Sequence, residues 1–217
     1  MNSLSLSSLG VKNEAFLNEG RKCVYKALIY LEEIVSPLVD APFADYETGL
    51  ETIATFSDED RYNLVRKLGF TIDSLLEGYG ENSKWKWSFV DLEGRFAVVV
   101  KNLLNLNTFV AGMDPRVKGF SARKAHLELA RELLQQAADR YREKYELSTM
   151  RVDDIKAGIN FLAAVRRLHV VLGESEPPED DPLAGLSGAR VPRPPSGAPH
   201  GTGSTSLESP RGDGETD

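Results

Sequence analysis

The sequence has a single cysteine, Cys23, among its 217 residues. One cysteine excludes an intramolecular disulfide framework and a metal site built from several thiolates, and it fits a reducing compartment. No apolar run approaches the roughly 18 residues that a membrane-spanning helix needs, and the first residues lack the basic segment of a secretory signal. We therefore expect a cytoplasmic protein that does not enter a membrane.

Acidic residues outnumber basic ones by 33 to 26, which gives a formal net charge of −7 and argues against a general polyanion binder. Nearly all of the excess lies in residues 174–217, which hold nine acidic and three basic residues and eight of the eleven prolines. Without an aromatic residue, this stretch cannot bury enough apolar surface to offset the entropy of ordering. We expect a flexible N-terminus over 1–12, a helical bundle domain over 13–173 and a disordered acidic tail over 174–217.

Apolar residues between about 13 and 173 recur at steps of three and four, which is the spacing of amphipathic helices. One heptad-like series predicts a single long helix over about 82–112: Trp85, Phe89, Leu92, Phe96, Val99, Leu103, Leu106 and Val110. A weaker series that includes Val90, Ala97 and Lys101 lies about 200° around the same helix. A helix that is apolar on two sides is usually central. Gly94 on the second face suggests that a neighbouring helix approaches closely.

Five further segments show helical spacing and end signals. Pro37 should end the first near Ser36, and Ser57 is the expected N-cap of the third. The predicted segments are 24–36, a short helix around 50–53, 58–80, a helix from the N-cap Ser121 to about 147, and 152–172. In the last of these the residues expected to pack are Val152, Ile155, Ile159, Leu162, Val165, Leu168 and Leu172. Strand signals are absent, so the sequence predicts an all-α antiparallel bundle of about six helices.

Residues that could support chemistry are few. None of His126, His169 and His200 has a glutamate three residues earlier, the spacing typical of metal sites in helical bundles. Cys23 falls among apolar residues of a predicted helix, where a packed thiol is the simpler interpretation. Neither a nucleotide-binding glycine loop nor a Gly-x-Ser-x-Gly elbow is present. We assign no catalytic residue, no metal ligand and no cofactor.

The segment Lys84-Trp85-Lys86-Trp87 most resembles a binding site. Trp85 begins the main apolar series, so it is expected in the core, whereas Trp87 points the other way, toward a second packing face or solvent. An exposed tryptophan flanked by lysines would suit a protein contact. The same residues could stack on bases and neutralise phosphates. The candidate interaction residues are Lys84, Lys86 and Trp87.

Three functional hypotheses follow. The leading one is a cytoplasmic helical module for protein–protein interaction or scaffolding, without catalytic activity, with a protein partner of unknown identity. The second is a nucleic-acid-associated protein that uses Lys84-Trp85-Lys86-Trp87, although the net charge makes nucleic acid an unfavoured partner. The third is an enzyme with an unrecognised helical active site. The heptad-like series leaves a coiled coil between two copies of the chain open.

Overall fold

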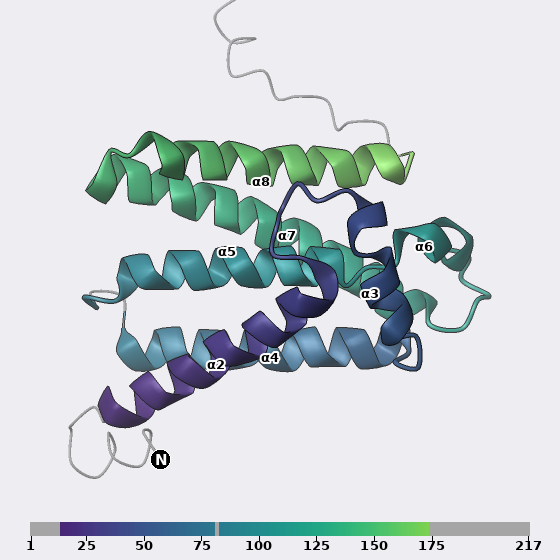
Figure 1. The fold of residues 1–217 in the computed structure, drawn as a ribbon, viewed down its shortest axis with the longest axis horizontal. Helices are drawn as coiled ribbons and strands as arrows, with labels where there is room; N and C mark the ends of the chain where they lie inside the picture. Colours follow the sequence, from purple (N-terminus) through teal and green to yellow (C-terminus); the bar gives the residue numbers. More distant parts are fainter. Residues whose placement is uncertain (1–13, 81–82, 174–217) are drawn as a thin grey trace, which may run out of the picture. The chain divides into compact units, whose positions relative to one another are not determined.

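The computed structural model describes residues 14–80 and 83–173. In these two ranges all the regular secondary structure is helical, which confirms the predicted all-α bundle, and each of the six predicted segments forms helix (Figure 1). The α-helices are α2 (Glu14–Val35), α3 (Glu47–Thr52), α4 (Asp58–Tyr79), α5 (Lys86–Asn102), α6 (Leu106–Gly112), α7 (Phe120–Lys144) and α8 (Val152–Val171). A 3-10 turn, η1 (Phe43–Asp45), precedes α3, and a π-helical turn, η2 (Tyr145–Thr149), joins α7 to α8.

The predicted N-terminal segment 1–12 and the predicted tail 174–217 lie outside the described residues. Across the ranges 14–80 and 83–173, none of the helices combines the length and the apolar character needed to cross a membrane.

Local signals in the sequence fix several helix ends. Ser57 forms a capping box with Asp60: the serine hydroxyl accepts from the Asp60 backbone, and the Asp60 carboxylate accepts from the Ser57 backbone. At the other end of α4, Gly80 takes a φ of 80°, a conformation that glycine adopts without steric cost. Helix α2 ends at Val35, directly before Ser36 and the predicted breaker Pro37.

Helix α5 is central, as its two apolar faces predict. It contacts α2, α4 and α7, and in Figure 1 it runs between α4 and the pair formed by α7 and α8. Both faces are buried in the single chain, so the heptad-like series does not need a second copy to cover it. Buried residues of the main series are Phe89, Leu92, Phe96, Val99 and Leu103, and those of the second are Val90, Gly94, Ala97, Lys101 and Leu104.

The prediction of one continuous helix over 82–112 is wrong, because α5 ends at Asn102 and α6 begins at Leu106. The last residue of α5, Asn102, has no exposed surface. Its side-chain amide donates to the carbonyls of Ser36 and Leu38, at 3.0 and 3.3 Å. A buried amide needs such partners, and here they lie on the segment after α2. Helical spacing alone could not show that this contact competes with a straight helix.

The start of α7 also differs from the prediction. The helix begins at Phe120, and its N-cap is Gly119, with a left-handed φ of 85°, in place of Ser121. Arg123 explains the shift, because its guanidinium donates to the carbonyls of Gly112 and Lys118, which folds the preceding loop against the first turn. The same guanidinium pairs with Asp58 at the start of α4, at 2.5 Å. A buried arginine, and not a serine cap, positions this helix start.

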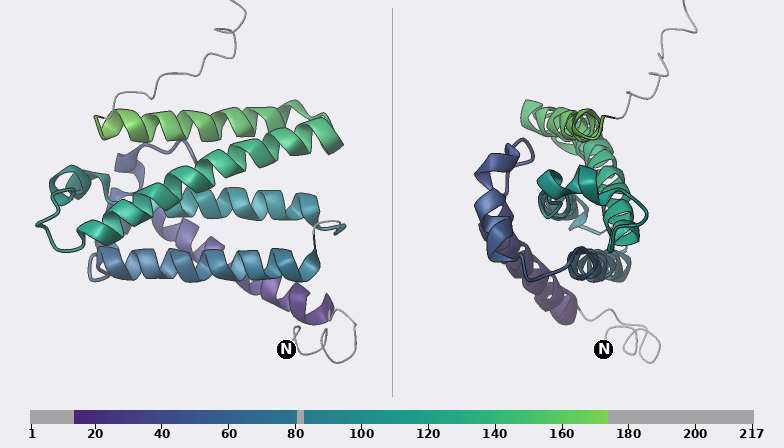
Figure 2. Two further views of the ribbon diagram at one scale, coloured as in Figure 1. Left: turned by 180° about the vertical axis from the view of Figure 1, so that it is seen from behind. Right: turned by 90° about the vertical axis from the view of Figure 1, so that its right-hand side faces the viewer.

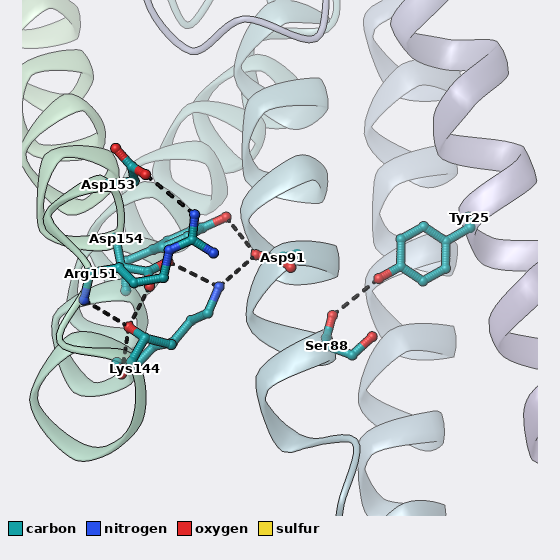
Figure 3. A network of polar contacts seen from close by, with 9 residues as sticks. Tyr25, Ser88, Asp91, Lys144, Arg151, Asp153 and Asp154 are labelled. Atoms are coloured by element: carbon teal, nitrogen blue, oxygen red, sulfur yellow. Dashed lines mark hydrogen bonds and ion pairs between the residues drawn. The ribbon is translucent and has the colours of Figure 1, made fainter.

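A polar network joins α5, α7 and α8 at one end of the helical unit (Figure 3). The Lys144 ammonium lies between Asp91 of α5 at 3.2 Å and Asp154 of α8 at 3.0 Å. The Thr149 hydroxyl donates to Asp154 at 2.5 Å. Burial alone would raise the pKa of Asp154, but the Thr149 hydroxyl and the Lys144 ammonium together lower it. The first turn of α8 is therefore held by charge pairing as well as by packing.

The prediction for the last helix is correct for Leu168, which is buried, and for Val165 and Leu172, which pack against the core, but it is wrong for the aliphatic residues nearer the start of the helix. Helix α8 lies against α7 through Gly158, Phe161, Ala164 and Leu168, whereas Val152, Ile159 and Leu162 are exposed. A Cβ added to Gly158 would come within 3.2 Å of the Ala138 carbonyl oxygen, so the two helices approach closely on the small-residue side. Close approach gains dispersion contacts along the whole interface, which favours this face over the bulkier aliphatic one.

Candidate interaction surface

Helix α8 presents an apolar stripe to solvent. Figure 2 shows, from behind and end-on, that α8 lies at the edge of the helical unit, beyond α7. Val152, Ile159 and Leu162 keep 58%, 57% and 45% of their surface exposed. With the half-buried Ile155 they follow 3-4-3 spacing, and we call these four residues the α8 stripe. Scattered exposed apolar residues are ordinary, but an aligned set at this spacing is the pattern of a helix that receives another helix.

Positive charge borders the α8 stripe. Lys156 and Arg166 are exposed on the same side of the helix as Ile159 and Leu162. Helix α8 contains only two acidic residues, and both are engaged: Asp153 pairs with Arg151 at 3.4 Å, and Asp154 is buried against Lys144. The surface is therefore apolar along its centre and cationic at its margin.

The lysines of the segment predicted as an interaction site are both ion-paired. Lys84 lies 3.7 Å from Glu14, and Lys86 lies 2.7 Å from Glu143. The Lys86 ammonium also sits 4.8 Å from the centre of the Trp87 ring, and Trp87 itself is half-buried. The three candidate residues thus lie next to one another at the start of α5, and the charges of the two lysines are already paired within the chain.

Trp85 is a packing residue, as its place in the main apolar series predicts. The Arg21 guanidinium lies 4.0 Å above its ring, and the edge of the ring meets Tyr79 at a centroid distance of 6.5 Å. Arg21 also donates to the Ser88 hydroxyl at 3.0 Å. These contacts join α2, the end of α4 and the start of α5. Trp85 therefore contributes to the fold.

The titratable residues weighed in the sequence lie apart. His126 is buried on α7, and its Nε2 lies 2.9 Å from the Val100 carbonyl oxygen. Burial lowers its pKa to about 4, so the ring is neutral at physiological pH. His169 is half-buried on α8, and His200 lies outside the described residues. Within 14–80 and 83–173, no group of three or more His, Cys, Asp or Glu side chains could hold a metal ion.

Cys23 is exposed, so the expectation of a packed thiol is wrong. Its neighbours Val24 and Ala27 are oriented toward the bundle, but the helical rotation of 100° per residue turns Cys23 away. Burial of Cys23 was predicted from the apolar residues next to it in the sequence. Residues at adjacent positions point in different directions on a helix, so such neighbours do not show which face a residue occupies.

Sequence reasoning missed the α8 stripe as a surface, because it assigned those residues to the core. The signal that could have revealed it was present: a second set of small and aromatic residues, from Gly158 to Leu168, lies on the opposite side of α8. A helix at the edge of the bundle has a neighbour on one side only, so when it carries two apolar faces one of them remains exposed to solvent. Lys101 was also passed over, although it is a charged residue within an otherwise apolar series.

Comparison with known proteins places the chain in a family. The model of the TP0443 family matches residues 1–181, which is most of the chain. The chain therefore belongs to the TP0443 family. No curated protein and no solved structure matches it significantly.

Proposed function

We propose that this member of the TP0443 family is a cytoplasmic helical protein-interaction module without catalytic activity, and that its docking face is the α8 stripe. The observation that carries the proposal is the exposure of Val152, Ile159 and Leu162 in helical register on an edge helix. Covering a large aliphatic side chain contributes about 1.5 to 3 kcal/mol. Because the three side chains are about half exposed, a partner that covers them gains part of this amount from each.

The partner we propose is an amphipathic helix with acidic margins. A helix laid along α8 would place its own apolar residues between Ile159 and Leu162, in the helix-in-groove manner of many peptide complexes. Lys156 and Arg166 beside the stripe would meet its acidic residues. The same cations oppose self-pairing of α8, because two copies would bring like charges together. A cytoplasmic site agrees with the single, exposed thiol of Cys23.

The sequence-predicted residues Lys84, Lys86 and Trp87 provide a second, smaller contact in this proposal. Trp87 retains some exposed surface, but the Lys86 ammonium that lies over its ring is paired with Glu143. A phosphate backbone would have to displace Glu14 and Glu143 from the two lysines, so this geometry gives the nucleic-acid alternative less support. The burial of His126 against Val100 likewise gives little support to an enzyme site there.

The test uses the full chain and a labelled designed peptide of about three heptads, with leucine at the apolar positions and glutamate at the margins. Fluorescence anisotropy should show saturable binding, at least tenfold tighter than for a matched peptide with lysine margins. Ile159→Asp should abolish binding because it places a charge in the centre of the stripe. Lys156→Glu should reduce the preference for the acidic peptide.

Phe70→Asp is the matched control, because Phe70 on α4 is 74% exposed and lies outside the stripe. Binding by Phe70→Asp at the level of the unmodified chain, with loss in Ile159→Asp, would support the proposal. Equal loss in both variants would overturn it. Sedimentation that shows a dimer dissociated by Ile159→Asp would assign the stripe to a second copy. Binding to anionic vesicles that Ile159→Asp removes would assign it to a lipid surface.

A further inference from the structure

A cavity of 540 Å³ lies between the end of α8, the last turn of α5 and the segment that leads into α3. Its size falls in the range of small-molecule sites, about 300 to 1,000 Å³. Most of its wall is apolar, with contributions from Ala41, Phe43, Tyr46, Leu106, Leu168 and Val171. The charged residues at its wall are Lys101, Arg166, Arg167 and Asp40. The cavity opens to solvent beside the exposed Arg166 and Arg167, and its lining carries more cationic than anionic side chains.

Lys101 is the unusual member of this wall, because it is only 7% exposed. Its ammonium donates to the Val39 carbonyl oxygen at 3.0 Å and lies 6.0 Å from the centre of the Tyr46 ring. Among the described residues, no carboxylate comes within ion-pair distance of it. An ammonium can donate three hydrogen bonds, and a buried cation without a counter-charge is costly.

Surrounding groups act on the charge of Lys101 from three sides. Burial, and to a smaller extent the Arg167 guanidinium of α8, lower the pKa of Lys101 to about 8, although Asp40 of the facing segment acts to raise it. Burial raises the pKa of the Tyr46 phenol to about 12, so this group stays neutral over the whole range in which Lys101 titrates. Lys101 is therefore a cation at neutral pH whose charge would be favoured by an added anion.

The wall opposite α8 is held in place by α5. Asn102 donates to the Ser36 and Leu38 carbonyls, and Lys101 and Arg167 both donate to Val39, the latter at 3.4 Å. Ser36 keeps a φ of 80°, which is strained for a residue with a Cβ. Strain of this kind persists only where the surroundings fix it, so the segment that leads to the cavity wall is held in one conformation by its contacts with α5 and α8.

We propose that this cavity binds a small carboxylate with an apolar body, its carboxylate at Lys101 and Arg167 and its body against Tyr46, Phe43 and Leu168. The carboxylate supplies the counter-charge that Lys101 lacks, and the apolar side chains of the wall contact the body of the ligand. An anion without an apolar body would leave most of the cavity unfilled. A neutral apolar molecule would leave the charge excess in place.

Isothermal titration calorimetry on the full chain with 2-naphthoate tests this, with 2-naphthamide as the neutral probe of the same shape and inorganic phosphate as the probe without a body. We expect naphthoate to bind with one-to-one stoichiometry at least tenfold more tightly than naphthamide. Phosphate should not compete. Raising the pH from 7 to 9.5 should weaken naphthoate binding at least tenfold, because Lys101 loses its proton, and should leave naphthamide unaffected.

Two variants locate the site. Lys101→Met keeps the volume of the side chain and should reduce naphthoate binding at least tenfold without changing naphthamide binding. Arg167→Gln alters an exposed residue, so it keeps the fold even if Lys101→Met does not, and it should weaken naphthoate binding threefold or more. Ile159→Asp on the α8 stripe should have no effect, which separates this cavity from the docking face.

Three results would overturn the proposal. Equal affinity for naphthoate and naphthamide would show that the cations do not contribute. Complete competition by phosphate would show a simple anion site. Naphthoate binding that survives both Lys101→Met and Arg167→Gln, or its absence at millimolar concentration, would show that the cavity does not take such a ligand.

Discussion

Gly94 of α5 lies directly against the ring of Tyr141 on α7: a Cβ added to the glycine would come within 2.9 Å of Tyr141 Cε2 and within 3.2 Å of Phe161 Cζ. The Tyr141 ring cannot easily withdraw. It stacks on Phe161 with 5.5 Å between centroids, and its hydroxyl donates to Asp91 at 3.2 Å. One missing side chain thus lets α5, α7 and α8 meet.

Gly94→Ala should therefore destabilise the protein. Helix propensity alone would favour alanine by about 1 kcal/mol, whereas overpacking a core costs about 1 to 3 kcal/mol. We expect a net loss of about 1 kcal/mol in the free energy of unfolding, measured by urea titration. Gly20→Ala is the control, because its added Cβ meets only the flexible end of Leu75, at 3.0 Å. A Gly94→Ala protein as stable as the unmodified chain would contradict the close approach.

Ser57→Ala should lower the free energy of unfolding by about 1 kcal/mol, since it removes the hydroxyl that caps α4. The same urea titration measures the change. Ser74→Ala serves as a comparison: Ser74 is exposed within α4, and its hydroxyl donates only to the Phe70 carbonyl of the same helix. That substitution should alter stability by less than about 0.5 kcal/mol. Equal effects of the two substitutions would show that the capping box is not what stabilises this helix start.

His126 should make stability depend on pH. Its pKa is lowered by burial to about 4, below the value near 6.5 of an unfolded chain, so the unfolded state binds the proton first. The free energy of unfolding is then unaffected above about pH 6.5 and falls as the pH drops toward 4. Between pH 7 and 5 the loss assigned to this residue is about 2 kcal/mol.

His126→Gln isolates that contribution, because glutamine can still donate to the Val100 carbonyl and does not titrate. Urea titrations of both proteins at pH 7 and pH 5 should give a smaller decrease for the variant, by about 2 kcal/mol. Should the two proteins lose the same stability over this interval, the histidine is not neutral and buried as the structure describes it.

The sequence was sufficient where the determining forces are local. The helical class, the N-cap at Ser57 and the end of α2 before Pro37 each depend on residues within a few positions. The central place of α5 was also predictable, because two apolar faces on one helix require two neighbours.

For the segment from Lys84 to Trp87, the sequence showed which residues are present but not which residues surround them in the fold. Its sequence shows two cations and two indoles, and the structure adds Glu14 and Glu143, which lie far from it in the chain. A surface charge pattern therefore indicates a candidate site without showing whether its charges are already paired.

By itself the sequence determined that this chain forms helices and roughly where they begin and end, since hydrogen bonding, capping and spacing act within a turn or two. Only the tertiary structure decided which face of α8 is covered, where the helix after Trp85 breaks, and that Lys101 is enclosed beside a cavity. The reason is that each of these outcomes depends on the free energy of a whole interface between elements that are distant in the sequence. Gly158 against Ala138 and Asn102 against Ser36 join residues that no local pattern relates.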